Sequence, residues 1–85
     1  MNLTEIKMNA LCTKLTVRLR ESLKYRDDAV QTWRRFVLEY CSFEDGMPSN
    51  PAALPPIENE QLTGSMTYWN KQVARDTVNL EKAMK

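Results

Sequence analysis

The sequence contains no histidine, the residue that most often acts as a general base or binds a metal. Its two cysteines, Cys12 and Cys41, form no C-x-x-C pair, and without histidine they cannot complete a four-ligand zinc site. Only two glycines are present, and the chain has neither a P-loop nor a G-x-G-x-x-G motif. We therefore expect no catalytic residues, no metal and no cofactor, and we interpret the cysteines as reduced, half-buried thiols.

The chain also has no long apolar run and no excess of one charge. No stretch of 18 apolar residues could form a membrane span, and the first ten residues mix acids and bases, unlike a signal peptide. The 12 Lys and Arg against 11 Asp and Glu give a formal charge of +1, which argues against a nucleic-acid coat or a polybasic membrane binder. We expect a cytoplasmic protein that does not bind membranes.

Glycine and proline are confined to a short part of the chain. Residues 1–45 contain neither, whereas one glycine and all four prolines fall between positions 46 and 56. Because these residues interrupt helices, their distribution predicts a single all-helical domain over residues 1–85. We expect a helix over about 3–42, an acidic, proline-rich connector over about 43–61 and a second helix over about 62–84.

The N-terminal segment has helical periodicity. At 100° per residue, eleven residues fall within one arc of about 120°, and the phase holds without a slip, which favours one continuous helix. A break near Asp27 is the alternative, because Asp28 and Gln31 have capping-box spacing, and it would make a three-helix bundle. The eleven residues are Met8, Leu11, Cys12, Leu15, Leu19, Leu23, Val30, Trp33, Val37, Tyr40 and Cys41.

The C-terminal segment carries a second apolar stripe, in which Thr77 takes the place of an apolar residue in one turn. Thr63 or Ser65 is a candidate N-cap for this helix. The two stripes together predict an all-α antiparallel helical hairpin with coiled-coil-like packing. The stripe consists of Leu62, Met66, Trp69, Val73, Leu80 and Met84.

The lengths of the two segments predict a register for the hairpin. Trp33 would lie near Val73, and Met84 would reach only as far as Leu23 or Ser22. Arg26 falls inside the apolar arc, where its charge needs either access to water or a partner. Asp76, on the edge of the second stripe, is the candidate partner.

In this register residues 3–21 project beyond the second helix and carry apolar side chains. A two-helix hairpin also has a thin core, and a domain this small is marginal alone. We therefore expect a homo-oligomer, with a dimer favoured. The candidate association residues are Leu3, Ile6, Met8, Leu11, Leu15 and Leu19.

These features favour a non-catalytic protein–protein interaction module, such as an adaptor, an assembly factor or an inhibitor of a larger target protein. The connector offers one candidate contact surface, because residues 41–62 contain four acids and no base. Possible partner contacts there are Leu54 and Pro55, and Tyr68 is a further one in the second helix.

A nucleic-acid-binding helical dimer is the alternative function. Residues 1–40 contain eight bases and five acids, and the bases lie on two flanks of the helix. A symmetric dimer could join these flanks into one basic surface that binds phosphates. The candidate contacts are Lys14, Arg18, Arg20 and Lys24.

Overall fold

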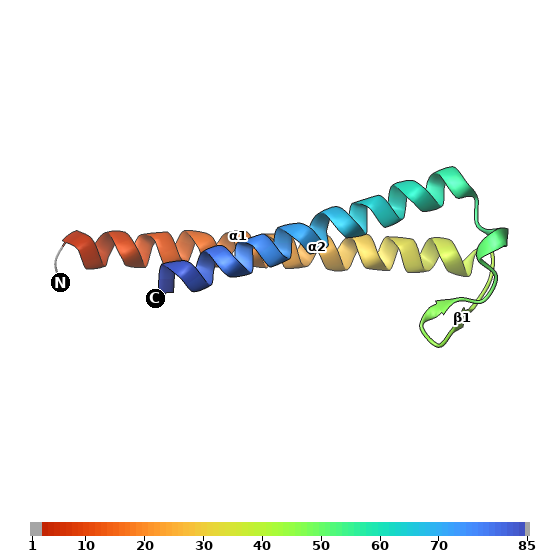
Figure 1. Cartoon of the computed structure of the whole chain (residues 1–85), viewed down its shortest axis with the longest axis horizontal. Helices are drawn as coiled ribbons and strands as arrows, with labels where there is room; N and C mark the ends of the chain where they lie inside the picture. The colour runs from red at the N-terminus through yellow and green to blue at the C-terminus, as the bar shows by residue number, and fades with distance from the viewer. Residues whose placement is uncertain (1–2, 85) are drawn as a thin grey trace.

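The chain folds into an extended antiparallel helical hairpin (Figure 1). A computed structural model describes the backbone of residues 3–84 and the side chains of residues 9–84. The hairpin measures 60 × 23 × 15 Å and has a radius of gyration of 18.1 Å, against about 12 Å for a compact chain of this length. In chain order the elements are α1 (Leu3–Leu38), β1 (Phe43–Glu44), β2 (Met47–Pro48), the short 3₁₀ helix η1 (Pro51–Ala53) and α2 (Pro56–Met84).

Helix α1 is unbroken, which confirms the predicted hairpin with a long N-terminal helix. The three-helix alternative is therefore wrong, because α1 continues through Asp27 without interruption. No glycine or proline interrupts it, and the hydroxyls of Thr13, Thr16 and Thr32 each donate to the backbone carbonyl four residues earlier. Helix α1 ends at Leu38, four residues before the predicted end.

The connector contains a tight β-hairpin that was not predicted from the sequence. Asp45 and Gly46 both have positive φ, 53° and 79°, as a type I′ turn requires, and Asp-Gly is a favoured pair for that turn. The turn lies between β1 and β2, which pair antiparallel. The amide of Ser49 donates to the carbonyl oxygen of Ser42 at 2.8 Å and closes the base of this hairpin.

Helix α2 begins at Pro56, six residues before the predicted start. Proline suits the first position of a helix, because the amide hydrogen it lacks would have no partner there and its φ is already helical. The amide of Asn59 donates to the carbonyl oxygen of Pro55 at 2.9 Å, the first bond of the helix. The predicted N-caps Thr63 and Ser65 are therefore wrong, since both lie inside α2.

Three polar contacts between the helices fix the register of the hairpin. The predicted pairing of Trp33 with Val73 is wrong by three to four helical turns, because α2 starts earlier and runs further along α1 than expected. Helix α2 consequently covers α1 as far as residue 12, and the projecting part of α1 is much shorter than the predicted 3–21. The contacts are Cys12 Sγ to the Ala83 oxygen at 3.8 Å, Ser22 Oγ to Asp76 Oδ2, and Trp33 Nε1 to Asn59 Oδ1 at 2.9 Å.

Between the helices lies a seam of half-buried and buried residues at alternating spacings of three and four. This spacing corresponds to 3.5 residues per turn, whereas the predicted stripes assumed 3.6 residues per turn. The predicted stripe therefore departs from the observed seam toward the end of α2. It placed Thr77 and Met84 where the structure has Asp76 and Ala83. The seam consists of Cys12, Leu15, Leu19, Ser22, Arg26, Ala29, Trp33 and Phe36 on α1, and of Asn59, Leu62, Met66, Trp69, Val73, Asp76, Leu80 and Ala83 on α2.

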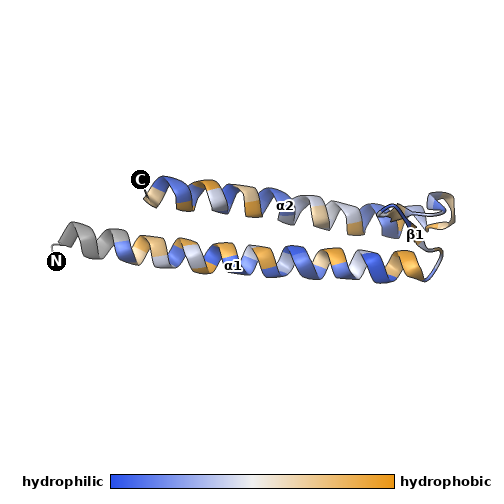
Figure 2. Ribbon diagram, turned by 90° about the horizontal axis from the view of Figure 1, so that it is seen from below, coloured by the Kyte–Doolittle hydropathy of each residue, from blue (hydrophilic) through white to orange (hydrophobic). Residues whose placement is uncertain are grey.

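Very little of the described chain is fully buried. Over residues 9–84, the buried apolar side chains are Val37 and Leu54, at 0 % and 6 % exposure. The exposed surface is 6555 Å², roughly 1,300 Å² more than a compact protein of this mass presents. Figure 2 shows apolar segments interrupted by hydrophilic ones along both helices. The hairpin alone therefore has no extended apolar core.

The observed register makes a prediction about Trp33 and Asn59. Trp33→Phe and Asn59→Ala should show a coupling free energy of about 1 kcal/mol in a double-mutant cycle, because each substitution removes the same hydrogen bond. Urea unfolding of the four proteins measures it. Trp33→Phe combined with Val73→Ala is the matched control and should be additive within about 0.5 kcal/mol. Coupling to Val73 instead of Asn59 would restore the register predicted from the sequence.

Candidate interaction surfaces

The middle of the seam holds a buried polar contact. Ser22 and Asp76 are each 5 % exposed, and the Ser22 hydroxyl donates to Asp76 Oδ2. Arg26 contacts Asp27 of its own helix at 3.2 Å, and its side chain is 34 % exposed. The predicted Arg26–Asp76 pair is therefore wrong. Arg26 reaches solvent from the seam, as the alternative interpretation held.

Beside this contact lies an aromatic cluster on one side of the hairpin. The rings of Tyr25 and Trp69 stack with centroids 4.8 Å apart, and Tyr68 packs edge-on against Trp69 at 4.9 Å. The cluster borders a groove of about 370 Å³, here called the central groove. Two arginines and two acids line it, so its charges balance. The lining residues are Arg18, Glu21, Ser22, Tyr25, Trp69, Gln72, Arg75, Asp76 and Asn79.

A second concavity of about 370 Å³ lies near the connector and is here called the loop-end pocket. Trp33 and Phe43 meet edge to face on its wall, with ring centroids 5.7 Å apart. The guanidinium carbon of Arg34 lies 5.5 Å from the centroid of the Phe43 ring, within cation–π distance. The pocket is lined by Val30, Trp33, Arg34, Phe43, Gly46 and Met66. Four of these six residues have large apolar side chains.

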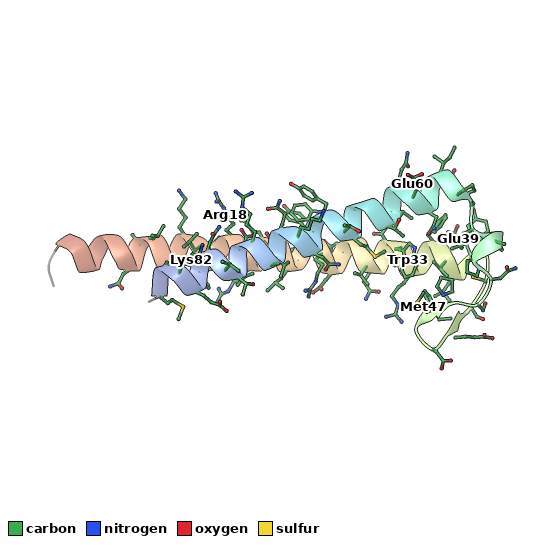
Figure 3. The ribbon with its side chains drawn as sticks, in the orientation of Figure 1. Arg18, Trp33, Glu39, Met47, Glu60 and Lys82 are labelled. Carbon is green, nitrogen blue, oxygen red and sulfur yellow. The ribbon has the colours of Figure 1, made fainter. Side chains whose placement is uncertain are left out.

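Charge is unevenly distributed along the hairpin. Figure 3 places Arg18 and Lys82 in the half that lies away from the connector, and Glu39 and Glu60 beside the connector. Residues 34–62, which comprise the connector and the helix ends beside it, contain five acids and two bases, Arg34 and Arg35. The connector end of the molecule therefore carries a net negative charge, and the opposite half contains bases of both helices.

The predicted association residues do not form one free surface. Leu15 and Leu19 are half-buried in the seam, and α2 runs alongside them, so they do not project beyond it. Leu11 is 48 % exposed at the edge of the region that α2 covers. The side chains of the other three predicted residues, Leu3, Ile6 and Met8, lie outside the described residues.

The residues predicted to contact a partner differ in their exposure. Leu54 is buried against its own chain, so its prediction as a partner contact is wrong. Pro55 is half-buried, and Tyr68 is 54 % exposed beside the aromatic cluster. The four bases predicted for nucleic-acid contact, Lys14, Arg18, Arg20 and Lys24, are exposed. Of these four, Arg18 lines the central groove.

Two features of these surfaces were missed in the sequence. The Asp45-Gly46 turn, which brings Phe43 to the loop-end pocket, has a local signal, because Asp-Gly between two short segments is typical of a β-hairpin. The Ser22–Asp76 contact has no such signal. It depends on the 3.5-residue seam and on a register that the composition of the connector did not reveal.

Cys12 and Cys41 are both free and half-buried, and the half-burial agrees with the prediction. Within the described part of the chain, no group of three or more Cys, Asp or Glu side chains is placed to hold a metal ion. Neither of the long helices, as far as they are described, combines the length and the hydropathy needed to cross a membrane.

Comparison with known protein families, with curated proteins and with solved structures found no match to this chain.

The buried polar contact predicts an asymmetric mutational response. Ser22→Ala should destabilise the fold by about 1–3 kcal/mol, because it leaves the Asp76 carboxyl buried without its hydrogen-bond donor. Adding Asp76→Leu should recover that loss, since a seam with both groups apolar leaves no polar atom unsatisfied. Urea unfolding midpoints measure both effects.

Thr13→Ala is the control for this pair, because its exposed hydroxyl bonds only within its own helix at 2.9 Å. It should change the free energy of unfolding by less than about 0.5 kcal/mol. If the double variant were as unstable as Ser22→Ala alone, the contact would not be the cause of the loss.

Proposed function

We propose that this chain is a non-catalytic protein–protein interaction module that self-associates, with a dimer favoured, and docks on a larger protein. An adaptor, an assembly factor or an inhibitor would act in this way, and we place it in the cytoplasm. The observation that supports the proposal most directly is the small buried core of a hairpin that exposes 6555 Å². A chain of this shape gains stability when a second molecule covers part of its surface.

The excess exposed surface of the hairpin is large enough for a protein–protein interface. A standard protein–protein interface removes about 800 Å² from each partner. The hairpin exposes roughly 1,300 Å² more than a compact chain of its mass, so one interface would remove a large share of the excess. A two-helix hairpin with so small a core is marginal alone, and disulfides, metals or association are the usual ways in which a small core is supplemented. Since both cysteines are free, association is the remedy that this chain's residues favour.

The self-association face that we propose follows one strip of α1. Leu11, Arg18 and Tyr25 recur at seven-residue steps, which keeps them on the same side of a coiled-coil-like seam. Leu11 and Tyr25 are both 48 % exposed. Leu15 and Leu19 are not part of the proposed face, because α2 partly buries them. Arg18 and Tyr25 also line the central groove, which continues the strip onto α2.

Leu11 and Val17 provide a matched test of this face. Both are aliphatic residues of α1 with similar exposure, 48 % and 47 %, but Val17 lies off the strip. Leu11→Asp should weaken self-association at least tenfold, because it inserts a charge into the interface, whereas Val17→Asp should leave it unchanged. Sedimentation velocity over a range of micromolar concentrations measures the dissociation constants.

A strictly monomeric parent protein at 100 μM would contradict self-association. Equal weakening by the two substitutions would contradict the choice of the strip while leaving association intact. Circular dichroism compares the helix content of each variant with that of the parent. A variant with unchanged helix content and weaker association has lost the interface and not the fold.

The second candidate function is nucleic-acid binding by the dimer. The exposure of Lys14, Arg18, Arg20 and Lys24 in the single hairpin favours it, and all of these except Arg18 lie outside the proposed self-association strip. Double charge reversal at Arg20 and Lys24, which lie outside the self-association strip, should abolish retardation of DNA or RNA at low salt if this function holds. No retardation of either nucleic acid by the parent chain removes the candidate.

A further inference from the structure

We propose that the loop-end pocket binds a partner segment in which one large apolar side chain is flanked by lysine or arginine. This inference rests on the proposed function, because it names the surface with which the module would engage its larger protein.

The wall of the pocket suits an apolar anchor. Val30, Trp33, Phe43 and Met66 are each half-buried, so their inward surfaces are already partly withdrawn from water. The volume of about 370 Å³ lies within the range of pockets that enclose small ligands or single large side chains. A phenylalanine or leucine side chain would bury further apolar surface of these four residues, which is the main source of affinity in such anchors.

Gly46 lines the pocket at the turn of the β-hairpin. A Cβ built on this glycine would meet no atom within 4 Å, so open space adjoins the turn at this point. The positive φ of 79° holds the glycine in a conformation that other residues rarely adopt. The turn therefore borders the pocket without filling it.

The pocket is preformed because its walls are tied together. Trp33 Nε1 donates to Asn59 Oδ1 of α2 at 2.9 Å, which fixes the indole between the two helices. Its edge-to-face contact with Phe43 joins the helices to the β-hairpin. A binding site already held in shape loses little conformational entropy when a ligand enters, and this favours affinity.

The charge around the mouth selects the neighbours of the anchor. Glu44 and Asp45 are exposed on the turn next to Gly46, and residues 34–62 at this end of the hairpin contain five acids against two bases, Arg34 and Arg35. Arg34 is a cationic member of the lining, and its guanidinium lies against the face of the Phe43 ring. The two acids on the turn outnumber this single cation beside the pocket. Lysine or arginine beside the anchor would be attracted to this region, and acidic segments would be repelled.

The two tryptophans provide a readout with an internal control. Trp33 lines the loop-end pocket, whereas Trp69 lines the central groove. The probes are synthetic peptides of twelve residues with a central phenylalanine flanked by two lysines on each side, the same peptide with glutamates for lysines, and the lysine peptide with serine for phenylalanine. The basic phenylalanine peptide should shift the Trp33 indole N–H signal in ¹H–¹⁵N spectra and leave the Trp69 signal in place.

Two variants test the two parts of the site separately. Glu44→Gln combined with Asp45→Asn removes the charge and keeps the turn, because asparagine tolerates positive φ, and it should weaken binding by roughly three- to tenfold. Val30→Phe fills the pocket and should abolish binding. If Val30→Phe fails to fold, the charge variant still tests whether the acids attract the lysines, and the serine peptide still tests whether the pocket needs an apolar side chain.

Three results would overturn the inference. They are no shift of Trp33 at millimolar peptide, equal binding of the lysine and glutamate peptides, and a shift of Trp69 equal to that of Trp33. These outcomes are independent of sedimentation. A chain that dimerises but ignores the peptide contradicts the pocket alone, whereas a monomer that binds it contradicts self-association alone.

Discussion

Two helices packed side by side can shield only one strip of each from water, and this geometric limit governs the whole molecule. Most of the remaining surface of α1 and α2 faces solvent, and even the seam residues stay half-exposed apart from Ser22 and Asp76. Over the described side chains, Val37 and Leu54 form the entire buried apolar set, both near the connector. Hydrophobic burial within one copy is therefore small, and a partner surface becomes part of the energetics of the fold.

Polar contacts set the register that the sparse apolar core leaves weakly specified. Ser22–Asp76 and Trp33–Asn59 lie at two levels of the seam, and a slide of either helix by one turn would break both. Burying such groups adds little net stability, but leaving them unpaired is costly, so they discriminate against other registers. The register in turn brings Met66 of α2 to the loop-end pocket and Arg75 to the central groove. The surfaces proposed for binding thus depend on two hydrogen bonds.

The architecture could be predicted from the sequence, whereas its register and its surfaces could not. Periodicity without glycine or proline was sufficient for a long first helix, and the proline-rich segment correctly marked the reversal of the chain. Proline is ambiguous, however, since Pro56 starts α2 instead of preceding it. This error moved the register by several turns and wrongly left Leu15 and Leu19 uncovered. A helical wheel of 3.6 residues also cannot locate Asp76 in the seam, because paired helices follow a repeat of 3.5.

The central claim is that a second molecule supplies stability which one hairpin lacks. Urea unfolding measured at two protein concentrations a hundredfold apart tests it most directly, since the unfolding of a dimer depends on concentration and that of a monomer does not. The account predicts that the more concentrated sample is more stable by about 2.7 kcal/mol per mole of dimer, with a higher urea midpoint. Identical midpoints at both concentrations would contradict it.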